Sequence, residues 1–424
     1  MNNEKNNLNA QSRCKYNFFI VKNGLRQITG SFRCLCSFLA LLGLLGVLLV
    51  LYTYISPEYL RGFVASCGRS LFFISPILLL YFYGNIKGGR AYYNNLVRAG
   101  FVNAAGEAPF LMDSTKDGKG EILVFRCNGL PIERWRENKE LLQTVFNATI
   151  AYIRPGHDHR TVRVKVVPSN VSFSAVIPWR DDYIDRDNKA CVVLGEDIAG
   201  ETVSVDLERS PMVLLAGSTG SGKTRLAILI LRQLILHRSH VAVIDFKGLD
   251  FQGLVSQGVE IMTTQEDILA HLRTMITELQ TRLELWRAVN ATSFADYIEK
   301  SGDTAVGRYV LLIDECAMLT DYGTSKEAKA FSAEVIDGLA AIARAGRAVG
   351  MHLIVSTQRP DMNAVPGSIK SNLDVRIMGK CDATLSTMVL GDGRAAALIP
   401  PDSQGRFVIN NGYEDIVFQA YYVE

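Results

Sequence analysis

The feature that most restricts the fold of this 424-residue chain is an eight-residue glycine-rich segment, Gly217–Thr224. It reads Gly-Ser-Thr-Gly-Ser-Gly-Lys-Thr and follows a short apolar run, Met212–Ala216, that predicts a buried strand. The apolar segment Arg225–Leu236 after it predicts a helix. In such a unit the backbone N–H groups of the loop close around phosphates, and the helix N-terminus adds the positive end of its dipole. The segment therefore predicts an α/β fold with a phosphate-binding loop.

The residue types in this loop indicate a nucleoside triphosphate and a magnesium ion as ligands. Lys223 would reach the β- and γ-phosphates, and the Thr224 hydroxyl would hold Mg²⁺. We therefore expect the chain to bind and hydrolyse ATP, with the whole loop in contact with the nucleotide: Gly217, Ser218, Thr219, Gly220, Ser221, Gly222, Lys223 and Thr224.

A second part of the same site is predicted about ninety residues further on. The apolar run Tyr309–Ile313 predicts a strand, and it ends in two carboxylates, Asp314 and Glu315. Asp314 would order Mg²⁺ through its water shell, and Glu315 would orient or deprotonate the attacking water. The alternative is an acidic pair on the surface at a strand end, which the preceding loop disfavours.

Two uncharged stretches near the start account for much of the 48% hydrophobic content. The first, Cys34–Pro57, is long enough to cross a bilayer, and the second, Ser70–Ile86, is at the lower limit for a spanning helix. A buried core helix is the alternative for the second. A cleaved signal peptide is disfavoured for the first because its apolar run is too long.

Basic residues flank both stretches and predict the orientation in the cell membrane. They precede the first at Lys5, Arg13, Lys15, Lys22, Arg26 and Arg33, and follow the second at Lys87, Arg90 and Arg98. We therefore expect a cytoplasmic tail over residues 1–33, a transmembrane hairpin over 34–86 with spans near 34–55 and 70–86, and both termini in the cytoplasm.

The overall charge does not distinguish between classes of binding partner, and the cysteine spacing matches no metal-binding motif. The formal net charge of +2 gives no argument for a nucleic-acid partner, so any such contact must come from local patches. The eight cysteines form no Cys-x-x-Cys pair and are interpreted as reduced thiols.

Beyond the hairpin, the pattern predicts two further regions. Residues 87–189 are interpreted as a linker over 87–110, a polar loop at 113–120, and a small α+β domain with strands at 121–126 and 161–167 and a helix at 131–146. Residues 190–424 alternate strands with helices, which predicts a parallel sheet covered on both faces. Its expected strands are 212–216, 241–245, 309–313, 352–356 and 405–409, with a long packing helix over 264–291.

Several blocks between residues 195 and 407 resemble the FtsK/SpoIIIE family of DNA-pumping ATPases. They are Gly195–Gly200 with the loop that follows, Ile244–Gly248, Ile342–Asp361 and Val365–Arg376. Two positions depart from the family pattern: Phe246 stands where a proline is usual, and Asp382-Ala-Thr384 stands where a DSR-like triplet is usual. The resemblance implies a RecA-like motor that hydrolyses ATP in a hexameric ring and moves DNA.

Further site residues are expected in these blocks. Gln358 ends an apolar strand beside the nucleotide and would sense the γ-phosphate or position water. Arg344 and Arg347 are candidates for an arginine finger offered to a neighbouring subunit, with exposed helix charges as the alternative. A polar loop over 359–376 would contact DNA phosphates without reading bases, through Arg359, Lys370 and Arg376.

The compact layout resembles the short, membrane-anchored FtsK-like coupling proteins of Gram-positive conjugative elements. That resemblance implies a membrane-anchored DNA translocase that serves as the coupling protein in conjugative transfer, with a relaxase and mating-channel proteins as possible partners. Chromosome segregation is one alternative, but no winged-helix module follows the motor. An FtsK-like protein-secretion ATPase is another, although such proteins generally carry several motors in tandem. A membrane scaffold with a decayed ATP site is disfavoured by the intact Lys223, Thr224, Asp314 and Glu315.

Overall fold

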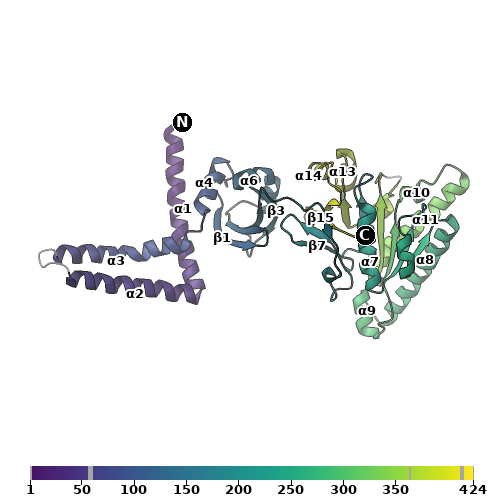
Figure 1. Cartoon of the computed structure of the whole chain (residues 1–424), viewed down its shortest axis with the longest axis horizontal. Coiled ribbons are helices and arrows are strands. Elements are labelled where there is room, and N and C mark those ends of the chain that lie inside the picture. Colours follow the sequence, from purple (N-terminus) through teal and green to yellow (C-terminus); the bar gives the residue numbers. More distant parts are fainter. Residues whose placement is uncertain (1, 56–60, 362–363, 411–414, 424) are drawn as a thin grey trace. The chain divides into compact units, whose positions relative to one another are not determined.

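The computed structural model describes residues 2–55, 61–361, 364–410 and 415–423, with side chains described from residue 16 onward. The chain divides into two compact units, one ending at Val171 and one beginning at Ser172 (Figure 1).

The first unit begins with three helices, two of which are long and apolar enough to cross a membrane. They are α1 (Asn2–Gly30), α2 (Phe32–Ile55) and α3 (Arg61–Gly84). The candidate spans are Phe32–Ile55 and Ala65–Gly84. Helix α2 buries none of its residues fully, and most of its leucines and valines are exposed, as in a helix that faces lipid.

Helix α1 packs closely on the last turn of α3. A Cβ added to Gly24 would lie 1.9 Å from the Leu80 carbonyl oxygen, and one added to Gly84 would lie 1.8 Å from the Ile20 oxygen. The Asn23 side chain donates a hydrogen bond of 3.3 Å to the Gly84 carbonyl. Two small residues therefore let the two backbones touch at this crossing.

The rest of the first unit is a small α+β domain. Its antiparallel sheet has the order β1-β2-β4-β3, and its elements are α4 (Gly89–Arg98), β1 (Phe110–Asp117), β2 (Gly120–Arg126), α5 (Ile132–Glu137), α6 (Lys139–Phe146), β3 (Ala148–Pro155) and β4 (Thr161–Pro168). One sheet face packs on the helices around Trp135, Phe125 and Leu96.

Two expectations for this domain were wrong. The segment 113–120, expected as a polar loop, is mostly strand β1 and its turn. Strand β1 lies at the sheet edge and exposes most of its second half, so polar residues are tolerated there. The expected linker over 87–110 contains helix α4, which buries Tyr93 and Leu96.

The second unit is built on one large mixed sheet of the order β10-β9-β11-β12-β8-β13-β14-β15-β6-β7, with β5 paired to β15. Its strands are β5 (Ile177–Pro178), β6 (Cys191–Asp197), β7 (Thr202–Asp206), β8 (Met212–Ala216), β9 (His240–Ile244), β10 (Glu260–Met262), β11 (Tyr309–Ile313), β12 (Met351–Thr357), β13 (Val375–Met378), β14 (Arg406–Asn410) and β15 (Asp415–Tyr422). The sheet is parallel from β10 to β13, as predicted. The predicted strand 405–409 is β14, but it pairs antiparallel with β13, so its expected parallel direction was wrong. The further antiparallel strands β15, β6 and β7 were not predicted.

Helices cover both faces of this sheet, as expected. They are α7 (Lys223–Leu236), α8 (Gln265–Ala288), α9 (Phe294–Ser301), α10 (Ala317–Thr320), α11 (Lys326–Ala345), α12 (Gly367–Lys370), α13 (Ala383–Leu390) and α14 (Arg394–Leu398). Successive residues of β8 enter different cores: Leu214 packs with residues of α8 and α11, and Leu215 packs with residues of α7. The central strand is therefore buried on both sides, which explains its continuous apolar sequence.

The second unit begins earlier than residue 190, where we had placed the start of the motor. Strand β5 adds to β15, and the Tyr183 ring stacks on Tyr421 with centroids 4.6 Å apart. These contacts attach residues 172–189 to the large sheet.

Candidate ATP site

The glycine-rich loop joins the carboxyl end of β8 to the first residue of α7. Gly222 caps the helix with φ 99°, a left-handed conformation that favours glycine. A Cβ on Gly222 would also lie 3.3 Å from the backbone of Gly405. The expected strand, loop and helix are confirmed, and α7 begins two residues before the predicted Arg225.

Residues next to the ends of β13 and β14 form hydrogen bonds to this loop and to the strand end before it. The Ser218 amide donates to the Lys380 carbonyl at 2.7 Å, and the Gly405 amide donates to the Ser221 carbonyl at 3.0 Å. Gly379, directly after β13, donates its amide to the Ala216 carbonyl at 2.8 Å. The sequence reasoning did not identify Gly379, Lys380 or Gly405, because these contacts join segments far apart in the chain.

The Lys223 ammonium lies inside the loop. It donates to the carbonyl oxygens of Gly217 at 2.6 Å and Ser218 at 3.4 Å. Burial lowers the pKa of Lys223, and the negative charges of Glu315 and Asp314 partly offset that effect. A second source of negative charge, such as phosphate, would stabilise the charged amine.

Asp314 follows β11 at the sheet edge where the loop lies. Its amide donates to the Ile244 carbonyl at 3.1 Å, which fixes it beside the end of β9. Burial raises the pKa of Asp314 to about 6, and nearby Asp245 and Asp250 add to the shift. A carboxylate held among other carboxylates, together with the Thr224 hydroxyl, offers the oxygen ligands that Mg²⁺ prefers.

The Glu315 carboxylate is fixed by the end of the next strand, β12. One oxygen accepts a hydrogen bond from the Thr357 hydroxyl at 2.6 Å, and the other accepts one from the backbone amide of Gln358 at 3.0 Å. The Gln358 side chain in turn accepts from the Thr219 hydroxyl of the loop at 2.7 Å. The structure therefore brings the loop, Glu315 and Gln358 together. Thr357 is an additional residue that the sequence reasoning missed.

Arg344 and Arg347 lie at the opposite end of the strands. Arg344 lies in the last turn of helix α11, and Arg347 lies in the 3₁₀ turn, Gly346–Val349, that precedes β12. The loop follows the last residue of β8, which runs parallel to β12. Both arginines are exposed and far from the ATP site of their own chain.

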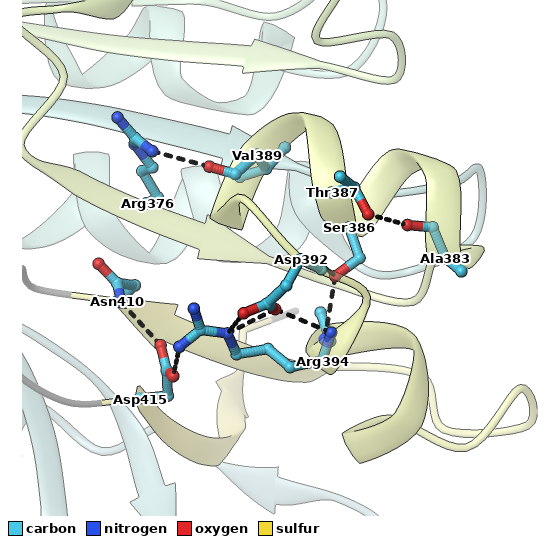
Figure 2. A network of polar contacts seen from close by, with 10 residues as sticks. Arg376, Ala383, Ser386, Thr387, Val389, Asp392, Arg394, Asn410 and Asp415 are labelled. Carbon is cyan, nitrogen blue, oxygen red and sulfur yellow. Dashed lines mark hydrogen bonds and ion pairs between the residues drawn. The ribbon is translucent and has the colours of Figure 1, made fainter. Parts of the chain in front are cut away.

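The three expected DNA-contacting residues differ in their surroundings. Arg359 is exposed. Lys370 donates to the Met388 carbonyl at 2.7 Å, and Arg376 donates to the Val389 carbonyl at 2.9 Å (Figure 2). Burial lowers the pKa of Lys370. Both cations thus hold the C-terminal end of α13, while residues 362–363 of the expected loop lie outside the described residues.

Helices α13 and α14 are tied to the end of the sheet by a polar network (Figure 2). Asp382 caps α13, accepting from the Leu385 amide at 2.7 Å. Arg394 donates to Asp392 at 2.6 Å and forms an ion pair with Asp415 of β15. Asp382 therefore serves as a helix cap in the triplet that departs from the family pattern.

A cavity of about 620 Å³ opens beside the first turn of α7. It is lined on one side by Gly222 and Leu226, and on the other by Arg406 and Gln419. The Arg406 guanidinium lies 4.1 Å over the Phe173 ring. The cavity is contiguous with the phosphate loop through Gly222.

A glycine-rich loop on a parallel sheet, with a lysine inside it and two carboxylates on a neighbouring strand, defines a P-loop ATPase. Residues 177–362 match the model of the FtsK/SpoIIIE family. The chain belongs to the FtsK/SpoIIIE family.

Individual relatives support this assignment. The DNA translocase FtsK of Listeria monocytogenes is 27% identical over 262 residues, covering 54% of this chain and 34% of that protein. This chain thus spans about a third of the length of the curated relatives it matches. The structure of the pCW3 conjugation coupling protein TcpA, with ATPγS, is 30% identical with a TM-score of 0.58, covering 80% of this chain and 96% of that chain. EssC from Geobacillus thermodenitrificans (ATPases 2 and 3), at 16% identity and a TM-score of 0.50 over 59% and 47% of the chains, shows the fold alone.

Proposed function

We propose that this chain is a membrane-anchored, ATP-driven DNA translocase that serves as the coupling protein in conjugative DNA transfer. The observation that carries this proposal is the likeness to a conjugation coupling protein over 96% of that protein's chain. The match covers 80% of this chain, a larger share than the second unit alone could supply. The likeness therefore extends beyond the ATPase fold that all P-loop motors share.

The site supports ATP hydrolysis by positioning and electrostatics. Lys223 would balance charge on the β- and γ-phosphates, and Thr224 and Asp314 would hold Mg²⁺, which would supply further positive charge to the phosphates. Glu315, fixed through both of its oxygens, orients and deprotonates the attacking water. Gln358 contacts both the loop and Glu315, so it can couple the presence of the γ-phosphate to the position of that carboxylate.

A ring of subunits, six in our proposal, would complete the site. Arg344 and Arg347 cannot serve their own ATP site, but their exposure suits a finger offered to the next subunit. Subunits carrying Arg344→Ala or Arg347→Ala should regain hydrolysis when mixed with Lys223→Ala subunits, because each type lacks a different half of an interface site. If no mixing ratio restores hydrolysis, neither arginine acts as a finger and both have a structural role.

The proposed topology places α2 and α3 across the cell membrane with both termini in the cytoplasm, where ATP is available. DNA, a relaxase and mating-channel proteins would be the partners on that side. Arg359 is the candidate for direct phosphate contact. Lys370 and Arg376 would shape the same surface by holding α13.

ATP hydrolysis by the purified full chain, with and without DNA, tests the proposal. DNA should stimulate hydrolysis, and Glu315→Gln should still bind ATP while turning over about 10²–10⁴-fold more slowly, the usual range for loss of a general base. Glu299→Gln, an exposed carboxylate on α9, is the matched control and should behave as wild type. Donor cells with Glu315→Gln should also lose plasmid transfer. Wild-type protein with neither DNA affinity nor DNA-stimulated hydrolysis would favour protein export instead.

A further inference from the structure

The first unit contains a cavity of about 670 Å³ that the ATPase function does not use. The second half of α1 forms one wall, from Phe18 to Thr29, and residues at or next to the ends of β1, β2 and β4 supply the rest of the lining. This volume is within the range of sites that bind small organic ligands.

The cavity lies next to the ends of the candidate membrane spans. Its wall residues on α1 include Asn23, which donates to the carbonyl of Gly84, the last residue of α3. At the other end of the wall, Thr29 is three residues before Phe32, the first residue of α2. When α2 and α3 cross a bilayer, this wall is therefore at the level of the lipid head groups.

The charge of the cavity is strongly positive. Four cations line it, with Glu107 as the carboxylate of the lining: Lys22, Arg26, Arg126 and Arg160. Across the described residues, these four side chains make no hydrogen bond or ion pair with one another or with Glu107. Arg126 and Arg160 lie close enough to Asp158 to help lower the pKa of that exposed carboxyl, after its hydrogen bond from Thr161.

The remaining lining is apolar and partly open to solvent. Phe19 and Phe110 stack with ring centroids 4.0 Å apart, which joins the two walls. Phe18 is 72% exposed and Leu25 is 53% exposed, so large apolar side chains border the charged groups. Because this apolar surface lies next to the ends of the candidate spans, a lipid acyl chain would cover it.

We propose that this cavity binds the head group of an anionic membrane phospholipid, with the lipid's phosphate on Arg126 and Arg160 and the start of an acyl chain along Phe18 and Leu25. The proposal rests on α2 and α3 crossing the bilayer and goes beyond the ATPase function. A lipid bound here would fix α1 and the small domain at the membrane surface.

Lipid titration of the full chain in neutral-detergent micelles tests the site. The probes are phosphatidylglycerol and phosphatidylcholine, each with a fluorophore on one acyl chain. Wild-type protein should bind phosphatidylglycerol at least about tenfold more tightly, because each basic residue near an anionic head group contributes about fivefold. Arg126→Gln with Arg160→Gln should weaken phosphatidylglycerol binding about 25-fold and phosphatidylcholine binding much less, because the choline cation of that head group already offsets the charge of its phosphate.

Arg134→Gln with Arg136→Gln is the matched control. Both arginines are exposed on α5 of the same domain and lie outside the cavity. This pair should bind phosphatidylglycerol as wild type does. Equal binding of the two lipids by wild-type protein would overturn the proposal. Unchanged phosphatidylglycerol binding in the Arg126→Gln, Arg160→Gln variant, or the same loss of binding in the control variant, would also overturn it.

Two further measurements keep the outcome clear. Thermal melts show whether the Arg126→Gln, Arg160→Gln variant is folded. If it is not, Lys22→Gln with Arg26→Gln on α1 replaces it and should show the same loss of phosphatidylglycerol binding. Alkaline carbonate extraction of membranes tests the hairpin separately. Release of wild-type protein by carbonate would contradict the membrane spans, whereas retained protein that does not distinguish the two lipids would contradict the lipid site alone.

Discussion

At the scale of single residues, the ATP site depends on hydrogen bonds that fix its carboxylates. Glu315 has both oxygens held by the end of β12, through the Thr357 hydroxyl and the Gln358 amide. A catalytic carboxylate fixed in this way needs little reorganisation during the reaction. In the proposed mechanism, Thr357 would act on catalysis through Glu315 and would therefore be a positioning residue.

Replacing Thr357 tests this positioning role. Thr357→Val keeps the shape but removes the hydroxyl, and a hydrogen bond to a charged group contributes about 1.5–3 kcal/mol. We expect kcat to fall about tenfold or more with little change in KM for ATP, measured by steady-state hydrolysis. Thr357→Ser retains the hydroxyl and should recover most of the rate. A rise in KM without a fall in kcat would instead assign Thr357 to ATP binding.

At the scale of elements, the ends of the parallel strands carry the site, and the polar segment after β12 leads to the proposed DNA surface. In that segment Arg359 is exposed, whereas Lys370 and Arg376 are bound to carbonyls of α13. Lys370 and Arg376 would have to give up these hydrogen bonds in order to contact DNA phosphates. The three cations therefore have different expected roles.

Salt titrations of DNA binding separate these roles. Arg359→Gln should reduce the slope of log affinity against log salt by about 0.9 on duplex DNA, for all sequences alike, because one phosphate contact is lost. Arg376→Gln should chiefly lower the melting temperature, because the Val389 carbonyl loses its donor. The full chain in detergent is used for both variants. An unchanged slope in Arg359→Gln would remove this residue from the DNA surface.

Elements buried on both faces were predictable from sequence, and elements defined by distant partners were not. Strands Met212–Ala216 and Tyr309–Ile313 were predicted to the residue, because continuous apolar runs mark the centre of a parallel sheet. Strand β1 was missed because its exposed edge tolerates polar residues. Thr357, Gly379 and Gly405 reach the site through contacts between remote segments, which no local pattern records.

At the scale of the whole molecule, the proposed membrane hairpin would determine which parts of the chain lie on each side of the bilayer. The candidate spans, Phe32–Ile55 and Ala65–Gly84, leave Gly30 before the first span and Gly62 before the second. Opposite ends of a hairpin face opposite compartments. Both glycines have open space around a Cβ, so a cysteine is tolerated at either position.

Cysteine labelling tests this topology in intact cells. In a background with the native cysteines replaced by serine, Gly62→Cys should react with an impermeant thiol reagent, because it lies on the outer side. Gly30→Cys should react only after lysis. Basic residues before the first span predict this orientation. Labelling of Gly30→Cys in intact cells would invert or abolish the proposed hairpin.

The packing of α1 determines where the protein can be shortened. Tyr16 and Ile20 of α1 belong to the same buried core as Tyr93 and Leu111 of the small domain, although the two spans separate them along the chain. A truncated protein that begins just after the hairpin would expose the surface these side chains cover, and it should aggregate. Truncation at Ser172 breaks no such core, since the second unit has hydrophobic clusters of its own. We therefore expect the small domain to need α1 in order to fold, whereas the second unit, which contains the candidate ATP site, is the part of the chain to purify alone.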